Sequence, residues 1–365
     1  MFECFRTRTP ALFGMDIGSS AIKLLQLSRR DSRYRVERYA SQALPPGAVV
    51  EKHIRDIAAV GAGIRQLLSD AGGGTRRAVV AVPGSAVITR RIALPAGLTE
   101  AELESQLVVE ADQHIPFPLD EVAIDFAPLP PAEPGVGGNR GGNADSIDVL
   151  LAACKKDNVD LRVAALEAGA CQAAVVDIET QAVERAFRLL CGQMGLGHDG
   201  AVAIVDLGAT LSTLHVLRDG QSIYVRELGF GGARLARAVQ QRCNLAPAAA
   251  VAALSATAGD LPAVCKQELL PSFRAQVCEQ LNRALRFFLS SSGYPAVDLI
   301  VLAGGPATTA GLAAQLEQAL AITTVVASPF ADMTVGRGVN RSQLERDGAA
   351  LLLASGLALR GCGGG

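Results

Sequence analysis

The chain has few aromatic residues, no tryptophan and almost no net charge. Of its 365 residues only 4% are aromatic and 19% are charged, with 34 Lys and Arg against 36 Asp and Glu. A near-neutral chain lacks the basic surface that nucleic-acid binding requires, so we expect no nucleic-acid partner. At 49%, hydrophobic residues are too abundant for a disordered chain. The length allows two or three domains with a sizeable core.

Cysteine and histidine are sparse and unpatterned. None of the eight cysteines forms a C-x-x-C pair, and the four histidines are scattered along the chain. This usage argues against a disulfide framework and against a zinc site. It fits buried thiols in a reducing compartment.

No hydrophobic run is long enough to suggest a membrane span. The longest uncharged stretch, 299–316, is interrupted by Gly304-Gly305-Pro306, whereas a spanning helix needs about 20 predominantly apolar residues. The first ten residues carry an acid and two arginines but no apolar core, so they do not form a signal peptide. We therefore expect a cytoplasmic protein without a transmembrane segment.

A repeat is the most informative feature that is present. Asp16-Ile-Gly18-Ser-Ser20 and Asp206-Leu-Gly208-Ala-Thr210 each follow a short apolar strand, and each leads into an alternating stretch, 22–27 or 213–217. A polar turn and a further strand follow both copies, and Asp219-Gly220 is a strong hairpin signal. Two such halves predict a duplicated α/β domain with a cleft between them.

A third glycine motif lies near the end of the chain. The buried strand 299–303 leads into Gly304-Gly305, and a helix is expected from Pro306 to about Leu320. Glycines at a strand-to-helix turn allow the backbone to approach a ligand closely. As the third of three ordered motifs, this turn supports a ligand site in the cleft.

Extra segments separate and follow these motifs. Strands are predicted at 78–83, 87–94, 122–129 and 146–154, and a capping box, Thr99-Glu-Ala-Glu102, begins a helix that runs to about His114. The glycine-rich stretch 130–143 opens no helix, so we interpret it as a solvent loop rather than a phosphate cradle. Residues 87–156 thus predict a small inserted α+β subdomain.

The segment 232–295 is predicted to be helical. Apolar side chains recur in it at helical spacing, which indicates core packing rather than a partner groove. These residues are Phe273, Val277, Leu281, Leu285 and Phe288.

The two Asp-x-Gly turns predict a polyphosphate site. Backbone N–H groups and the hydroxyls of Ser19, Ser20 and Thr210 suit phosphate oxygens, while Asp16 and Asp206 suit Mg²⁺ held through water. The Gly304-Gly305 turn would then take an adenosine. Lys23 either contacts phosphate as a point charge or faces solvent from its alternating strand.

These motifs resemble the phosphate-1, phosphate-2 and adenosine motifs of the actin-like ATPase superfamily. Three further segments, Gly84–Arg90, Glu110–Asp125 and Asp148–Val159, resemble the PilM family of type IV pilus assembly proteins, which is related to the cell-division protein FtsA. So do Phe330–Met333 and Gly356–Arg360. The resemblance implies an α/β fold of the duplicated actin-like (ribonuclease H-like) ATPase type, with two lobes around a nucleotide cleft and a small inserted α+β subdomain.

The resemblance also implies four subdomains and a cofactor. Subdomain 1A would comprise 11–86 and 157–198, 1C would be 87–156, 2A would comprise 199–231 and 296–360, and 2B would be 232–295. ATP with Mg²⁺ would lie in the cleft, with Asp16 and Asp206 as the catalytic and metal-holding residues. The residues expected to bind the nucleotide are Gly18, Ser19, Ser20, Lys23, Gly208, Ala209, Thr210, Gly231, Gly232, Gly304 and Gly305.

Two positions leave alternatives open. Ala209 stands where many relatives have a second glycine, and alanine restricts the backbone of the turn. Nucleotide binding is still expected, but whether hydrolysis occurs is an open question. Asp177 either positions water or metal, or caps the helix 179–190, and the cap is the favoured interpretation.

The resemblance implies a partner and a place in the cell. The cytoplasmic N-terminal tail of PilN would bind in a groove between subdomains 1A and 1C, recruiting the chain to the cytoplasmic face of the inner membrane. There it would contact other pilus assembly platform proteins and support pilus biogenesis and twitching motility. The alternatives are an FtsA-like cell-division filament protein and a small-molecule kinase of the same superfamily. FtsA-type proteins end in an amphipathic helix, which the terminal Leu359–Gly365 does not resemble.

Overall fold

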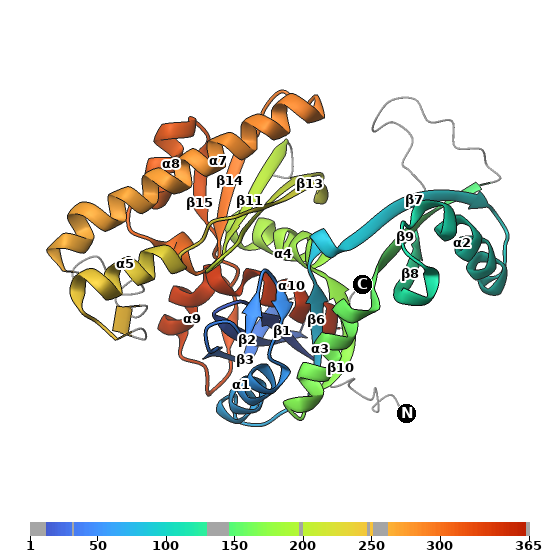
Figure 1. The fold of residues 1–365 in the computed structure, drawn as a ribbon, viewed down its shortest axis with the longest axis horizontal. Helices are drawn as coiled ribbons and strands as arrows, with labels where there is room; N and C mark the ends of the chain where they lie inside the picture. Colours follow the sequence, from blue (N-terminus) through green and yellow to red (C-terminus); the bar gives the residue numbers. More distant parts are fainter. Residues whose placement is uncertain are drawn as a thin grey trace. The chain divides into compact units, whose positions relative to one another are not determined.

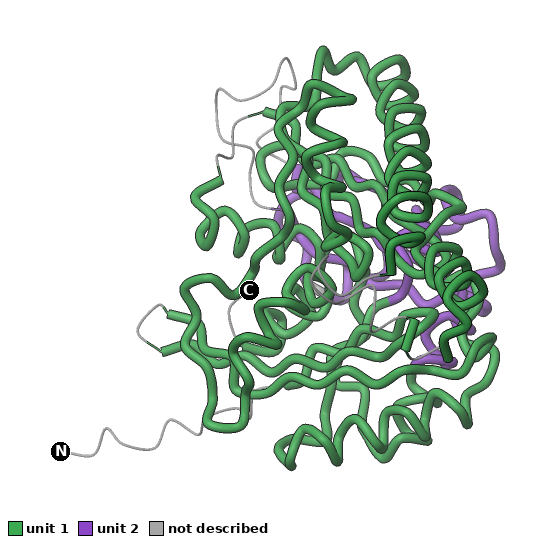
Figure 2. Tube along the Cα trace, turned by 90° about the vertical axis from the view of Figure 1, so that its left-hand side faces the viewer, with its two compact units in different colours: residues 1–81, 163–365 green, residues 82–162 purple. Residues whose placement is uncertain are grey.

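The computed structural model describes residues 12–30, 33–129, 146–196, 200–246, 249–250 and 262–362. The predicted solvent loop at 130–143 and both chain ends lie outside the described residues. The chain divides into two compact units, shown in Figure 2: unit 1 comprises Met1–Ala81 with Val163–Gly365, and unit 2 is Val82–Arg162. Each unit is described by itself.

Unit 1 contains a first sheet built around the first Asp-x-Gly strand. Its described strands are β1 (Phe13–Ile17), β2 (Ala21–Arg30), β3 (Arg33–Ala43), β6 (Arg77–Val82), β10 (Gln172–Ile178) and β16 (Thr334–Val335). They lie in the order β10-β6-β1-β2-β3-β16. Strand β1 pairs antiparallel with β2 and parallel with β6. Its apolar side chains Phe13 and Met15 are fully buried.

The second sheet of unit 1 repeats this arrangement. Its described strands are β11 (Ala201–Leu207), β12 (Ser212–Arg218), β13 (Gln221–Leu228), β14 (Leu299–Ala303) and β15 (Thr323–Val326), in the order β13-β12-β11-β14-β15. Strand β11 pairs antiparallel with β12 and parallel with β14, as β1 does with β2 and β6. Asp219 and Gly220 form the β12–β13 turn with φ of 52° and 71°, as expected for a type I′ hairpin. The predicted duplication is therefore present.

Helices cover both sheets (Figure 1). Those described within unit 1 are α1 (Ile57–Asp70), α4 (Glu179–Met194), α5 (Ala233–Cys243), α7 (Leu270–Ser292), α8 (Leu312–Leu320), α9 (Arg341–Asp347) and α10 (Leu352–Gly361), while α3 (Lys156–Ala168) crosses the boundary between the two units. The predicted stripe on α7, from Phe273 to Phe288, is buried in the core of the second sheet. None of the described helices is long and apolar enough to cross a membrane.

Helices α4 and α10 lie between the two sheets of unit 1. The apolar face of α4 packs on β11, and that of α10 packs on β2. Glycine makes this close packing possible, because a Cβ at Gly356 would lie 1.9 Å from the carbonyl oxygen of Ala182. A Cβ at Gly14 in β1 would lie 2.3 Å from the backbone nitrogen of Ala358. The two halves of the duplication thus share a tightly packed helical centre.

The helix expected from Pro306 to Leu320 is interrupted. Residues Gly305–Thr308 form a 3₁₀ turn, and α8 begins only at Leu312. Thr309 has a ψ of 126°, which is outside the helical region, and Gly311 has a left-handed φ of 76°. The continuous helix predicted from the sequence is therefore wrong over this stretch.

Unit 2 is a small α+β layer. Its sheet holds β7 (Val87–Pro95), β9 (Ser146–Lys155) and β8 (Val122–Pro128) in that order, all antiparallel. The helix α2 (Glu100–His114) begins at the predicted capping box, in which Thr99 Oγ1 accepts from the N–H of Glu102 and the Glu102 carboxylate accepts from the N–H of Thr99. Leu103, Leu107 and Ala111 of this helix pack on the sheet and form the core of the unit.

Candidate functional site

The first Asp-x-Gly motif places a carboxylate beside an ammonium. Asp16 is opposite Lys23 in the β1–β2 register, and Lys23 Nζ donates to Asp16 Oδ2 at 2.8 Å. Their side chains are only 12% and 22% exposed. Of the two alternatives for Lys23, the solvent-facing one is wrong, because its ammonium lies in a partly buried cluster.

Asp206 brings the second half of the duplication to the same cluster. Burial raises the pKa of Asp206, and the neighbouring Asp16 raises it further, while Lys23 and Lys52 oppose the shift. Burial acts against the charged form of Lys23, yet Asp16 and Asp206 outweigh it and raise the pKa of Lys23. The Lys23 ammonium therefore compensates carboxylates from both halves.

The two predicted phosphate turns meet in front of this cluster. Thr210 Oγ1 donates to Ser19 Oγ at 3.1 Å, which joins residues from opposite halves. Ser20 and Thr210 are exposed at the tips of their turns. Gly18 closes its turn by donating its N–H to the carbonyl of Ala21 at 3.1 Å. Hydroxyl groups from both turns thus line one exposed edge of the site.

The third motif lies directly against Asp206. Gly304 has a φ of 85°, and a Cβ there would lie 2.7 Å from Asp206 Oδ1 and 2.1 Å from the carbonyl oxygen of Leu207. A Cβ at Gly208 would lie 2.2 Å from the carbonyl oxygen of Leu211, whereas at Gly305 it would meet nothing within 4 Å. Only glycine fits at the first two positions, and Gly305 leaves open space beside the turn.

Gly231 and Gly232 support the second phosphate turn from behind. The N–H of Gly232 donates to the carbonyl of Gly208 at 3.0 Å, and the N–H of Ala233 donates to that of Ala209 at 2.8 Å. A Cβ at Gly231 would lie 2.4 Å from the Ala209 carbonyl oxygen. The start of α5 therefore fixes the backbone of this turn. Gly231 and Gly232 are thereby joined to the turn that follows Asp206.

Lys52 is a central residue that sequence reasoning missed. Its Nζ lies 2.6 Å from Glu179 Oε2, 3.1 Å from Thr213 Oγ1 and 3.5 Å from Glu227 Oε1. Burial acts against its charge, but Glu179, Glu227 and Asp206 prevail and raise the pKa of Lys52. It thereby ties the first half of unit 1 to α4, β12 and β13 beside the cluster.

The local backbone explains how Lys52 reaches these partners. It lies in the tight turn between β4 (Val49–Val50) and β5 (His53–Ile54), where Glu51 and Lys52 have φ of 48° and 63°. Non-glycine residues adopt such angles at a cost, so the surrounding contacts must hold them. No motif in the sequence marks this turn.

Comparisons with known proteins identify the family of this chain. The sequence profile of the family described as type IV pilus assembly protein PilM matches residues 14–362. The chain belongs to the PilM family. A solved structure titled "PilM-PilN type IV pilus biogenesis complex" contains a chain that is 28% identical, with a TM-score of 0.74, the match covering 98% of this chain and 100% of that one.

A more distant structure supports the fold alone. The ethanolamine utilization protein EutJ from Carboxydothermus hydrogenoformans is 13% identical, with a TM-score of 0.52 and coverage of 95% of this chain and 89% of that one. Together with the internal duplication, the PilM-family match confirms the predicted actin-like α/β fold.

The expected cap at Asp177 is wrong in this PilM-family chain. The N-cap of α4 is Ile178, and the Asp177 carboxylate accepts from the N–H of Ile178 and pairs with Arg185. Arg185 Nε also donates to the carbonyl of Gly356 at 3.0 Å. Asp177 is only 6% exposed, and it anchors the partly buried Arg185, which connects α4 to α10.

His215 lies buried in β12, two positions from Thr213. It is 2% exposed, and within the described part of the chain its Nδ1 has no hydrogen-bond partner. Burial first, and then the charge of Lys52, lowers the pKa of His215 to about 3. It is therefore a neutral imidazole beneath the Lys52 cluster at physiological pH.

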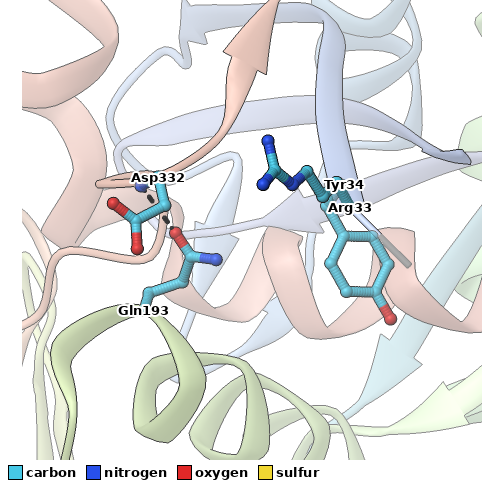
Figure 3. Close-up of a pocket in the computed structure, with 4 residues that line it drawn as sticks. All are labelled: Arg33, Tyr34, Gln193 and Asp332. Atoms are coloured by element: carbon cyan, nitrogen blue, oxygen red, sulfur yellow. Dashed lines mark hydrogen bonds between the residues drawn. The ribbon is translucent and has the colours of Figure 1, made fainter. Parts of the chain in front are cut away.

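A cavity elsewhere in unit 1 is separate from this cluster. It has a volume of about 420 Å³ and is lined by Arg33, Tyr34, Gln193 and Asp332, as Figure 3 shows. The N–H of Asp332 donates to Gln193 Oε1 at 2.7 Å. Arg33 begins β3 at the far end of the β2–β3 hairpin from Asp16. None of the predicted nucleotide residues lines this cavity.

Proposed function

We propose that this PilM-family chain binds ATP with Mg²⁺ at the Asp16–Lys23–Asp206 cluster and acts as a nucleotide-dependent component of the type IV pilus inner-membrane assembly platform. The observation that carries the proposal is the meeting of two duplicated phosphate turns, joined by the Thr210–Ser19 hydrogen bond, in front of carboxylates from both halves. Such a site offers donors to phosphate oxygens and acids to a hard cation.

The residues present fit Mg²⁺. Burial and Asp16 raise the pKa of Asp206, which marks a carboxylate that lacks full compensation of its charge. A divalent cation held through water by Asp16 and Asp206 would supply that compensation and would neutralise phosphate charge when bound.

The residues present also fit a polyphosphate. Lys23 supplies a point charge, and the hydroxyls of Ser19, Ser20 and Thr210 supply donors. Gly208 and Gly304 have no Cβ, which allows the backbone segments beside the cluster to pack closely. With these groups the chain itself orients the phosphates.

The partner that we propose is the cytoplasmic N-terminal tail of PilN. The support is the solved structure titled as a PilM–PilN complex, in which a chain 28% identical to this one matches it over 98% of its length. Binding to that tail would recruit the chain to the cytoplasmic face of the inner membrane and contribute to twitching motility. The division into subdomains 1A, 1C, 2A and 2B belongs to the same proposal.

A single-turnover experiment with labelled Mg-ATP tests the nucleotide site. The fraction bound and the fraction converted to ADP are both recorded for the natural chain, for Asp206→Asn and for Asp332→Asn. We expect Asp206→Asn to weaken Mg-ATP binding at least about tenfold, because it removes one of the two carboxylates that we propose hold Mg²⁺. Asp332→Asn, which changes a carboxylate of the separate cavity, should bind normally. Absence of ATP binding in the natural chain would overturn the proposal.

The same experiment decides whether the protein is an ATPase. Tight binding with negligible conversion would make it a scaffold held by nucleotide, and steady conversion would make it a true ATPase. Titrating a PilN-tail peptide with and without Mg-ATP then tests coupling, which predicts two different affinities. Equal affinities in both conditions would show that the nucleotide does not control the partner.

A further inference from the structure

Two cysteines outside the nucleotide site lie in unusual proximity. Cys243 is the last residue of α5, and Cys265 begins the π-helical turn Cys265–Leu269 that leads into α7. Their Sγ atoms are 3.1 Å apart. At this separation the two thiols form a hydrogen bond in which either sulfur can be the donor. A disulfide bond of about 2.05 Å would need the sulfurs to approach by only about a further 1 Å.

The surroundings hold this pair in place and allow that approach. Arg242 and Glu268, which flank the pair, form an ion pair across the same junction. Cys265 is fully buried in the core of the second sheet, against which Cys243 also packs. The backbone is irregular on both sides, because Asn244 is left-handed with a φ of 50° and a π turn follows Cys265. Irregular turns adjust more easily than the middle of a helix.

We propose that Cys243 and Cys265 are a reversible disulfide site, at which a low-molecular-weight disulfide such as oxidised glutathione covalently joins the end of α5 to the start of α7. The hydrogen bond between the two thiols already holds the sulfurs together, so closing a disulfide needs only a small further movement. Intracellular disulfides of this kind are typically transient and redox-responsive.

The chemistry proceeds by two thiol–disulfide exchanges. Cys243 is partly exposed, whereas Cys265 is buried, so the Cys243 thiolate attacks one sulfur of oxidised glutathione and releases one glutathione thiolate. The Cys265 thiolate then attacks Cys243 Sγ in the mixed disulfide and releases the second. Two protons pass from the cysteines to the two glutathiones, so the protein loses two hydrogens and glutathione disulfide is reduced.

The order of attack also follows from the environment of Cys265. Burial, with a further contribution from the neighbouring Cys243, raises the pKa of Cys265 to about 11. A thiol of this kind is a poor first nucleophile. It reacts only when an activated sulfur is placed next to it, which is the position that Cys243 holds.

Peptide mapping after oxidation tests the proposal. The folded chain is incubated with oxidised glutathione, free thiols are alkylated, and the digest is examined by mass spectrometry. We expect a linked peptide pair that contains Cys243 and Cys265 and that dithiothreitol separates. The buried Cys278 of α7 should remain a free thiol, which reacts with the alkylating reagent only after the chain is unfolded. The oxidised chain should also melt several degrees higher than the reduced chain.

Matched variants make the result decisive. Cys243→Ala alters the partly exposed partner, so it should fold, form no linked peptide and show no shift in melting temperature on oxidation. Cys278→Ala should link as the natural chain does. A stable glutathione adduct at Cys243 without the internal link, or no reaction at either residue in the folded chain, would overturn the proposal.

Discussion

Lys23 is the cation on which the charge balance of the site depends. We expect Lys23→Met to lower the free energy of unfolding by about 2 kcal/mol, since it leaves Asp16 and Asp206 as neighbouring, partly buried like charges. Removing one partner of a fully buried pair costs about 3–5 kcal/mol, and the 22% exposure of Lys23 reduces that figure. Urea unfolding at pH 7 measures the effect.

A double variant provides the control for Lys23. Adding Asp16→Asn to Lys23→Met removes one of the two like charges, so part of the lost stability should return. The free energy of unfolding is also measured for Asp16→Asn alone. If adding Asp16→Asn to Lys23→Met lowers this free energy as much as Asp16→Asn does in the natural chain, the two residues act independently and the balance of charges described above is wrong.

His215 gives the site a distinct dependence on pH. Its pKa is about 3 when folded, below the ordinary value of 6.5, so the unfolded chain binds the proton more tightly. Its stabilising contribution is therefore complete above pH 6.5 and is lost as the pH falls toward 3. The loss is about 1.4 kcal/mol per pH unit, or about 2–3 kcal/mol by pH 4.5.

The comparison variant for this prediction is His215→Gln, which has no titrating ring. Free energies of unfolding from urea curves at pH 7.5, 6.5, 5.5 and 4.5 should fall more steeply for the natural chain than for the variant. The variant shares all other titrating groups, so only the difference in slope is informative. Parallel curves would mean that His215 is hydrated or relaxes when protonated.

At the residue scale, the sequence allows a prediction where a local motif marks the position of a residue in the fold. Asp16 and Asp206 lie near the ends of β1 and β11, and three glycines follow strands directly. These are Gly18, Gly208 and Gly304. Lys52 was missed because its partners come from α4, β12 and β13, and no local pattern records that meeting. The left-handed backbone at Glu51 and Lys52 is also not marked by a glycine in the sequence.

At the scale of elements, the crossing of α4 and α10 depends on Gly356. We expect Gly356→Ala to destabilise the protein by about 3 kcal/mol, because its Cβ would lie 1.9 Å from the backbone oxygen of Ala182, which cannot move alone. Gly192→Ala on α4 is the matched control. A Cβ there meets nothing within 4 Å, so that variant should gain about 0.5–1 kcal/mol from helix propensity. Thermal unfolding distinguishes the two, and equal melting temperatures would contradict the tight crossing.

Elements were predictable where periodicity extends over several residues. The alternating strands β2 and β12 and the stripe of α7 were visible for this reason. Strands of two residues, such as β4, β5 and β16, carry no period and could not be seen. The break before α8 was missed because it depends on the backbone angles of two residues, Thr309 and Gly311, and not on a periodic pattern.

At the scale of the whole molecule, the first and last strands of unit 2, β7 and β9, are hydrogen-bonded neighbours. Val87 is paired with Cys154, and Ile88 with Ala153, in the β7–β9 ladder. Cross-strand partners lie about 4.5–5.5 Å apart, so a two-residue Asn-Gly turn can join Ile88 to Ala153 in place of 89–152. The sequence indicated this insertion through its position between the repeats. It could not show that Ile88 and Ala153 are cross-strand partners, because strand register is visible only in the folded sheet.

The excised chain separates the two parts of the proposed function. Since the nucleotide cluster lies wholly in unit 1, we expect the chain lacking 89–152 to fold and to bind Mg-ATP within about threefold of the natural affinity, a change of less than about 1 kcal/mol. Binding of the PilN-tail peptide should be lost, because the family resemblance implies that subdomain 1C, residues 87–156, takes part in it. Calorimetric titration measures both affinities, and thermal unfolding confirms the fold. Loss of ATP binding in a folded excised chain would mean that unit 2 contributes to the nucleotide site. Full retention of tail binding would mean that unit 1 alone carries the partner surface.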